Sequence, residues 1–239
     1  MQTYIWVCLI LFLAGFTQGL SGFGAILMSL PLLSIFLDIK TVIPLVALAA
    51  QAITLIILIQ LRQHLDWKKI LPLVISAFPG ILVGVYFLER MDKEVIHWIL
   101  GVTLIIYSLY GLFLKANKSG IREGWAYLFG FLGGCLGGAL SAAGPPVIVY
   151  TSLCLWGKDQ IKATLQGYFV LSGLVVIMAH AITGLTTPTA LRFFGIGLPI
   201  LFLGTCVGTR FYGLIKEAAY RKIMLILLSG MGVLMIYRA

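Results

Sequence analysis

The sequence predicts an all-α protein that crosses a membrane many times, and two properties of its 239 residues support this. Hydrophobic residues make up 61% of the chain, whereas only 10% of the residues are charged. A soluble domain carries about 25% charged residues, so this chain lacks the polar surface that water requires. Soluble enzymes, DNA-binding modules and disordered proteins are therefore excluded. The net charge of +9 is assigned to loops beside the membrane, with no nucleic-acid partner.

The charged residues cluster, and the stretches between the clusters have the lengths of membrane spans. Eight stretches contain no Asp, Glu, Lys or Arg: 1–37, 41–61, 70–88, 95–114, 124–157, 163–191, 193–209 and 223–237. A helix that crosses the hydrocarbon core needs about 20 apolar residues. We therefore expect a multi-pass protein of the cell inner (cytoplasmic) membrane, with the lipid bilayer as its surroundings.

The two halves of the chain resemble each other. Matching motifs recur in the same order, at offsets of 120 and 124 residues: Leu20-Ser21…Gly24 with Leu140-Ser141…Gly144, and Gly80-x-x-x-Gly84 with Gly204-x-x-x-Gly208. A recurrence of motifs in order and at constant spacing indicates an internal repeat. The sequence thus predicts a first transmembrane repeat over 1–114, a cytoplasmic linker over 115–124 and a second transmembrane repeat over 125–239.

The first segment of each half is too long for one span and short for two. Segment 4–37 is interrupted by glycines at 19–24, and segment 125–156 by glycines and a Pro-Pro pair at 137–146. Glycine-rich backbone does not propagate a helix, although proline fits well in a first turn. Each segment therefore predicts a broken helix, either a re-entrant hairpin or two full spans. Three spanning helices are expected to follow in each half.

The positions of the basic residues favour a return within each long segment. If each long segment crosses once, the two sides of the membrane hold 9 and 8 Lys+Arg, which is no bias. If each segment enters and returns, the sides hold 12 and 5. Cytoplasmic loops carry the excess of Lys and Arg, so both termini are predicted to lie outside. Each half then crosses an odd number of times, which makes an inverted-topology repeat of the kind found in secondary transporters.

The membrane interior of this chain offers neutral groups rather than ionised ones. All eight Asp and Glu residues fall in turns, which disfavours a carboxylate pathway for cations. The sequence shows no metal-binding cluster and implies no cofactor. Each break instead places the N-terminus of a short helix in the membrane, where N–H groups and the helix dipole favour an anion. The predicted cradle, in which the two helix ends meet near the midplane, consists of Gln18, Ser21, Gly22, Gly24, Gln51, Ser141, Gly144, Pro145 and Gln166.

Several of these residue types also have plainer interpretations. The paired glycines outside the breaks are interpreted as helix-packing positions: Gly80, Gly84, Gly204 and Gly208. The amides of Gln51 and Gln166 either line the transport path or bond a neighbouring helix. His180 is interpreted as an interfacial histidine with a local hydrogen bond rather than as a proton relay.

The two breaks also carry a family resemblance. The sequences Gly15-Phe-Thr-Gln-Gly-Leu-Ser-Gly-Phe-Gly-Ala25 and Gly133-Gly-Cys-Leu-Gly-Gly-Ala-Leu-Ser-Ala-Ala-Gly-Pro-Pro146, with the turn ending Asp66-Trp67-Lys68, resemble the sulfite exporter TauE/SafE family. The resemblance covers essentially the whole chain. It implies a transporter of a small sulfur-containing anion: sulfite, thiosulfate or an organosulfonate such as sulfoacetate. Export and import are both compatible with it.

We therefore expect a secondary transporter that works by alternating access and is not an enzyme. An intramembrane enzyme would need a nucleophile–base pair or a metal cluster at depth, and Ser141 has no histidine at a suitable position. A non-transporting membrane scaffold is the other alternative. It would need no polar break in either half, and a substrate would not change its thermal stability.

Overall fold

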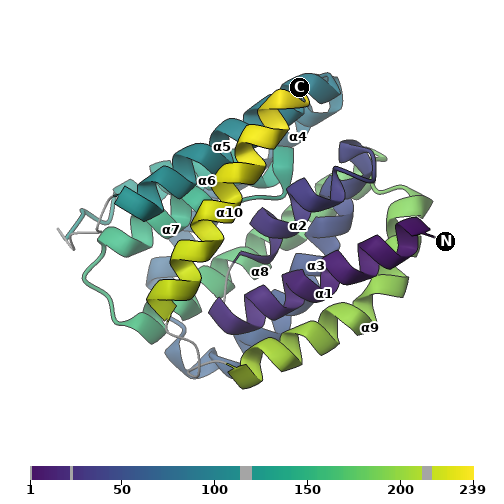
Figure 1. Ribbon diagram of the computed structural model, residues 1–239. Helices are drawn as coiled ribbons and strands as arrows, with labels where there is room; N and C mark the ends of the chain where they lie inside the picture. The colour runs from purple at the N-terminus through teal and green to yellow at the C-terminus, as the bar shows by residue number, and fades with distance from the viewer. Residues whose placement is uncertain (1, 22–23, 114–119, 212–216) are drawn as a thin grey trace. The chain divides into compact units, whose positions relative to one another are not determined.

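The protein is all-helical in the computed structural model shown in Figure 1, which describes residues 2–21, 24–113, 120–211 and 217–239. The described residues form a short 3-10 turn, η1, and ten α-helices: α1 Gln2–Ser21, α2 Ala25–Leu33, α3 Ile39–Gln60, η1 Arg62–His64, α4 Trp67–Arg90, α5 Lys93–Phe113, α6 Trp125–Leu140, α7 Gly144–Leu153, α8 Lys158–Ile182, α9 Pro188–Phe211 and α10 Glu217–Tyr237. The predicted all-α class is confirmed.

Six of the described helices are long and apolar enough to cross a membrane: α1, α3, α4, α5, α8 and α9. Helix α6 and the described end of α10 are apolar but shorter. Apolar sequence forms helices in lipid because a helix satisfies its own backbone N–H and C=O groups where no water is present. Large apolar side chains such as Ile75 and Phe78 remain exposed, as a lipid-facing surface requires. The chain is therefore a multi-pass membrane protein.

Both predicted helix breaks are present. Helix α1 ends at Ser21 and α2 begins at Ala25, whereas α6 ends at Leu140 and α7 begins at Gly144. In each case the short helix packs against the helix that precedes it. With 9 and 10 residues, α2 and α7 are only about 15 Å long at 1.5 Å per residue, so neither can cross a hydrocarbon core of about 30 Å. Helices α3–α5 follow the first break, and α8–α10 follow the second.

The helices group into two compact units, and each unit combines segments from both halves of the sequence. The first unit contains Met1–Ala49, Met91–Lys115 and Thr186–Ala239, and the second contains Ala50–Arg90 and Ala116–Leu185. The repeat boundary at 115–124 stays a prediction, because a sequence repeat need not fold as a separate body.

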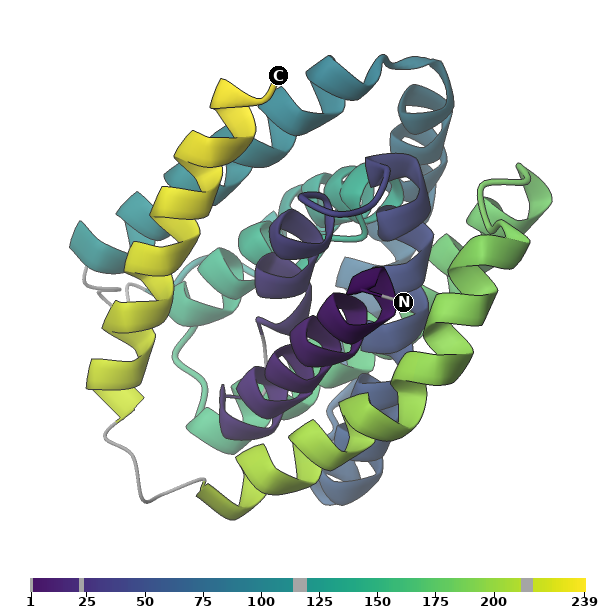
Figure 2. The same cartoon turned by 45° about the vertical axis from the view of Figure 1, so that its right-hand side comes forward.

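In the first unit α1 lies side by side with α9, as both Figure 1 and Figure 2 show. Gly15 lies against Leu201, and Gly19 lies one turn further on against Thr205, so the two helices run in the same direction. The glycines let the two backbones touch, as small residues do between helices in membranes. Helices α5 and α10 also lie side by side, but in opposite directions.

In the second unit α4 packs along α6 in the same way. Gly134 lies against Ala77, and Gly138 lies against Ile81 one turn further along both helices, so α4 and α6 are parallel. A Cβ on any of four glycines would meet the backbone of the facing helix: Gly80 and Gly84 against α6, Gly204 and Gly208 against α1. The predicted packing role of these four glycines is confirmed.

The α4–α6 and α1–α9 pairs have corresponding registers. Gly80 of α4 lies against Phe131 and Cys135, and Gly204 of α9 lies against Phe12 and Phe16. The two glycines are 124 residues apart, and their partners are 119 residues apart. Each pair joins one helix from each half of the sequence, which explains why neither half is a compact unit by itself.

Helix α8 packs against both α4 and α6 and positions the second break. The Tyr168 hydroxyl donates to the Gly130 carbonyl at 3.5 Å, and the His180 Nε2 lies 2.9 Å from the Gly138 carbonyl. Tyr168, nearer the start of α8, contacts the earlier part of α6, whereas His180, nearer the end of α8, contacts the later part of α6. Helix α8 therefore runs parallel to α6. The chain therefore reverses between α6 and α8, and α7 is the segment that returns.

Candidate functional site

The first break is built on a glycine in a left-handed conformation. Gly24 has φ 101° and ψ −10° and is the N-cap of α2. A residue with a side chain is strained at this φ, so the turn into α2 depends on glycine here. Two predicted site groups fall beyond what the structure describes at this break: Gly22, and the side chain of Ser21.

Gln18 binds the N-terminus of α2 directly. Its side chain is 4% exposed, and its Oε1 accepts a hydrogen bond from the backbone N–H of Ala25 at 3.2 Å. The first N–H groups of a helix have no partner within the helix, so this contact satisfies one of them. The sequence predicts Gln18 as a hydrogen-bond donor to an anion, whereas its amide oxygen is an acceptor here. An anion at this N–H would have to replace the Gln18 oxygen.

The second break is built on a serine. Ser141 has φ 55° and is the only residue other than glycine with a positive φ among the described positions. Its backbone N–H donates to the Gly137 carbonyl at 2.8 Å, and the N–H of Ala142 donates to the Leu136 carbonyl at 3.2 Å. These bonds close the C-terminus of α6 before the chain turns into α7. Ser141 is 5% exposed, so its hydroxyl is held inside the protein.

The start of α7 lies near the middle of a membrane span. A Cβ on Gly144 would lie 3.6 Å from the Phe169 ring, and Phe169 is the twelfth of the 25 residues of α8. Pro145 and Pro146 fill the next two positions of the helix. Because proline has no N–H, the first turn of α7 keeps only the donors of Gly144 and Val147. The dipole of α7 remains, but its N-terminus is poorer in donors than the sequence prediction assumed.

Two buried amides lie around the same part of α8. The Nε2 of Gln51, on α3, donates to the Val170 carbonyl at 3.2 Å, and its Oε1 lies against Gly173. Gln166 is fully buried on α8, one turn before Val170. Of the two roles predicted for Gln51, the structure thus shows the bond to a neighbouring helix. A role of either amide in binding a substrate stays a prediction.

The predicted site residues divide between the two compact units. Gln18 and Gly24 lie together in the first unit. The second unit holds Gln51, Ser141, Gly144, Pro145 and Gln166. In this second unit, Gln51 and Gly144 both lie close to the part of α8 between residues 166 and 173. The expectation that the two breaks serve one substrate stays a prediction.

His180 is buried rather than interfacial, so its predicted location is wrong. The side chain has no exposed surface, and its Nε2 donates to the Gly138 carbonyl at 2.9 Å. A carbonyl oxygen can only accept, so the Nε2 of His180 carries a proton in this contact. The position of His180 near the end of an apolar stretch predicts the interface, but the glycines of α6 let α8 approach closely enough to cover it. The predicted hydrogen bond is present, but it joins α8 to α6 rather than being local.

Charged groups tie the connection between α2 and α3, residues 34–38, to other helices of its own unit. Asp38 forms an ion pair with Lys93, at the start of α5, and Arg238 donates to the Ser34 carbonyl at 3.3 Å. Burial by itself raises the pKa of the Asp38 carboxyl, but hydrogen bonds and charges from Lys93 and Lys40 outweigh it. The net effect holds the pKa of Asp38 below 3.8.

Asp38→Asn is expected to lower the temperature of thermal unfolding slightly at neutral pH, because it removes the carboxylate that pairs with Lys93. A carboxyl with a lowered pKa stabilises the folded state above about 3.8 and loses this contribution as the pH falls and it is protonated. The difference from wild type should therefore narrow in acid. A double-mutant cycle with Lys93→Gln checks the pairing, and strictly additive effects would contradict it.

A helical bundle of membrane spans with paired broken helices is the architecture of a membrane transporter. The model of the sulfite exporter TauE/SafE family matches residues 7–235 of this chain. The chain belongs to the TauE/SafE family, whose members are membrane transporters and not enzymes. The resemblance drawn from the two glycine-rich breaks is confirmed.

Two relatives are similar to this chain at low identity. A "Probable sulfite/organosulfonate exporter TauE" from Cupriavidus necator is 27% identical over 177 residues, which cover 71% of this chain and 68% of the relative. A "Probable inner membrane transporter protein TsaS" from Comamonas testosteroni is 25% identical over 172 residues, which cover 71% of this chain and 72% of the relative. No solved structure matches the chain.

Proposed function

We propose that this protein moves a small sulfur-containing anion, such as sulfite, thiosulfate or an organosulfonate like sulfoacetate, across the cytoplasmic membrane by alternating access. The observation that carries this proposal is the pair of helix breaks, each of which starts a short helix whose residues are buried or half-buried. Family membership and the printed names of the two relatives support an anion of this class.

The charges of the described residues suit an anion better than a cation. The acids with described side chains lie at helix ends or in turns: Asp38, Asp66, Glu89, Asp92, Glu94, Glu123 and Asp159. The groups near the breaks are neutral, and they include the Gln18 amide, the Ser141 hydroxyl and the Gly144 N–H. Neutral donors and helix N-termini stabilise negative charge without a fixed positive charge that would trap it.

The helix directions support an inverted repeat with a return in each half. Helix α8 runs parallel to α6, and α9 runs parallel to α1. Successive spans of a membrane protein alternate in direction, so α8 and α9 cross in opposite senses. It follows that α1 and α6, the first helices of the two halves, also cross in opposite senses. We propose on this basis that both termini lie outside the cell, as the bias of 12 to 5 basic residues predicts.

Ligand-dependent stability is the first test of the proposed substrate class. The purified protein should unfold at a higher temperature in sulfite, thiosulfate or sulfoacetate than in chloride at equal ionic strength, because a ligand of the folded state stabilises it. Stabilisation of about 2.7 kcal/mol is expected at a ligand concentration 100 times the Kd. A panel with taurine included ranks the anions. A membrane scaffold would show no selective shift with any of them.

Ser141→Ala tests whether the second break binds the anion. The change removes a buried hydroxyl, so it is expected to weaken flux into proteoliposomes by about tenfold, the value of one lost hydrogen bond to a charged group. Ser141→Gly removes the same hydroxyl but suits the positive φ of 55°, and it should be equally defective despite a relaxed backbone. Ser21→Ala is the equivalent change in the first half. Unchanged flux and binding in all three variants would contradict the cradle.

A further inference from the structure

Two separate cavities lie along the same pair of helices, α4 and α8. The first is a polar cavity of about 690 Å³ where these helices begin, and it is lined by Gln63, His64, Leu65, Asp66, Trp67, Lys68 and Gln160. The second is an apolar cavity of about 360 Å³ further along, and it is lined by Val74, Ile75, Phe78, Ile81, Ser172 and Val175. We propose that the two cavities together form a binding site for one anionic glycerophospholipid, with the headgroup in the first and an acyl chain in the second.

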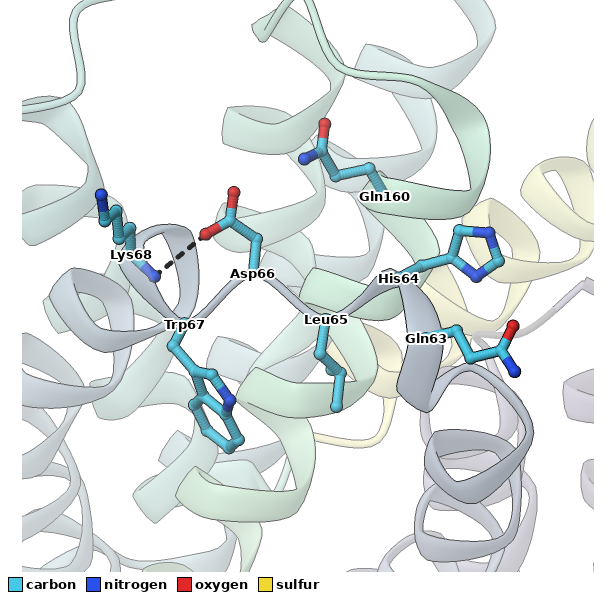
Figure 3. Close-up of a pocket in the computed structure, with 7 residues that line it drawn as sticks. All are labelled: Gln63, His64, Leu65, Asp66, Trp67, Lys68 and Gln160. Carbon is cyan, nitrogen blue, oxygen red and sulfur yellow. Dashed lines mark hydrogen bonds between the residues drawn. The ribbon is translucent and has the colours of Figure 1, made fainter.

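The polar cavity lies at the level of a headgroup. Trp67 begins α4 and is 53% exposed, and Trp156 precedes α8. Tryptophan at the ends of spans marks the interface between hydrocarbon and water. Figure 3 shows the side chains of Asp66 and Gln160 on one side of the loop and those of Trp67 and Leu65 on the other.

The charge around the polar cavity favours an anionic headgroup. The turn 61–69 carries three basic residues, Arg62, Lys68 and Lys69, against the single acid Asp66. Asp66 is already occupied, because it accepts from the Lys68 backbone N–H at 3.1 Å and pairs with Lys69 at 3.2 Å. Lys69 also stacks on Trp156, with its Nζ 4.9 Å from the ring centre. The exposed side chain of Lys68 lines the cavity and remains to meet a phosphate, assisted by the amides of Gln63 and Gln160, and the exposed Arg62 adds positive charge in the same turn.

The apolar cavity lies where an acyl chain would reach. Its residues on α4 follow Trp67 by 7 to 14 positions, and those on α8 follow Gln160 by 12 to 15. At 1.5 Å per residue these separations are about 10 to 23 Å, comparable with one leaflet of about 20 to 22 Å including its headgroups. Trp67, Val74 and Phe78 are spaced by seven and four residues and so share one stripe of α4.

The lining of the second cavity is chemically suited to a hydrocarbon chain. Its one hydroxyl, that of Ser172, donates to the Tyr168 carbonyl of its own helix at 2.6 Å. Ile75 and Phe78 are more than half exposed at the mouth of the cavity, whereas Ile81 is buried at its base. An acyl chain can therefore enter from the surrounding lipid. A free oxyanion would find no partner there, which is why we assign both cavities to a phospholipid.

The test measures lipid retention by the full-length protein in detergent, using native mass spectrometry with dioleoyl phosphatidylglycerol and dioleoyl phosphatidylcholine. The wild type is expected to retain phosphatidylglycerol preferentially. The Arg62→Ala/Lys68→Ala variant should lose about tenfold in that preference, since each basic residue near a membrane surface contributes to anionic-lipid binding. Arg192→Ala removes an exposed basic residue at the start of α9 and should change nothing.

A second variant tests the acyl chain independently of charge. Val74→Phe fills the apolar cavity and should weaken retention of both lipids several-fold, whereas Leu82→Phe, on the exposed face of the same helix, should not. Equal retention of the two lipids by wild type would overturn the proposal. So would displacement of phosphatidylglycerol by millimolar glycerol phosphate or sulfite, because that outcome identifies a site for free anions. Unchanged retention in both the double variant and Val74→Phe would overturn it as well.

Discussion

Gly134→Ala is expected to destabilise the protein by about 3 kcal/mol, although the same change normally favours a helix. A Cβ at this position would contact the Ala77 carbonyl and lie 2.8 Å from the Ala77 Cα. Both are backbone atoms, so α4 and α6 would have to separate along their length to admit one methyl group. Thermal unfolding in detergent and the yield of monodisperse protein measure the effect.

Gly195→Ala is the matched control, and its effect should have the opposite sign. Gly195 lies in an exposed part of α9, and a Cβ there would meet nothing within 4 Å. Alanine is more favourable than glycine in a helix by about 1 kcal/mol, so this variant should be as stable as wild type or more stable. If Gly134→Ala unfolds at the same temperature as Gly195→Ala, the two helices do not approach as closely as described.

Gly208→Ala extends the comparison to the other half of the sequence. Gly208 of α9 lies against the backbone of Phe16 in α1, and the corresponding Gly84 of α4 lies against Cys135 in α6. Because the two seams have corresponding registers, Gly208→Ala and Gly84→Ala should destabilise the protein by similar amounts. A loss confined to one of them would show that the halves are not equivalent in packing.

The helix breaks could be predicted from the sequence because their cause is local. The glycine at position 24 and the Pro-Pro pair at 145–146 interrupt a helix wherever it lies. The charge-free stretches likewise identify the spans, since the hydrocarbon core excludes ionised side chains. The periodic glycines indicate a packed face, because small residues let two helices approach closely. None of these arguments depends on which helix is the neighbour.

The residues that each glycine, amide or imidazole contacts could not be predicted, because these contacts depend on which helices pack against each other. Nothing in the spacing of Gly80 and Gly84 indicates that they contact α6 rather than another helix. The acceptor role of Gln18 depends on how α2 turns back toward α1, and the burial of His180 depends on how α8 approaches α6. An amide or imidazole at a given position therefore predicts a hydrogen bond, but its partner follows from tertiary packing.

Two turns of the protein are expected to differ almost completely in their accessibility to a reagent outside the cell. This difference would decide whether the two halves have opposite orientations in the membrane. The α3–α4 turn at 61–66 and the α8–α9 turn at 183–187 occupy the same place in their respective halves. In an inverted repeat they lie on opposite sides of the membrane, whereas in a repeat of equal orientation they lie on the same side. Gln63→Cys and Thr186→Cys place a thiol in each turn, where Gln63 is exposed and Thr186 is half-buried.

The four native cysteines, Cys8, Cys135, Cys154 and Cys206, are first replaced by alanine, and each single-cysteine variant is then expressed in whole cells. A membrane-impermeant maleimide should label Thr186→Cys from outside and leave Gln63→Cys unlabelled until the cells are opened. The basis is the excess of Lys and Arg on the side that includes Arg62, Lys68 and Lys69, which membrane insertion retains in the cytoplasm. The reversed pattern would place both termini inside, and labelling of both turns from one side would exclude the inverted repeat. Opposite labelling would agree with alternating access between two inverted halves.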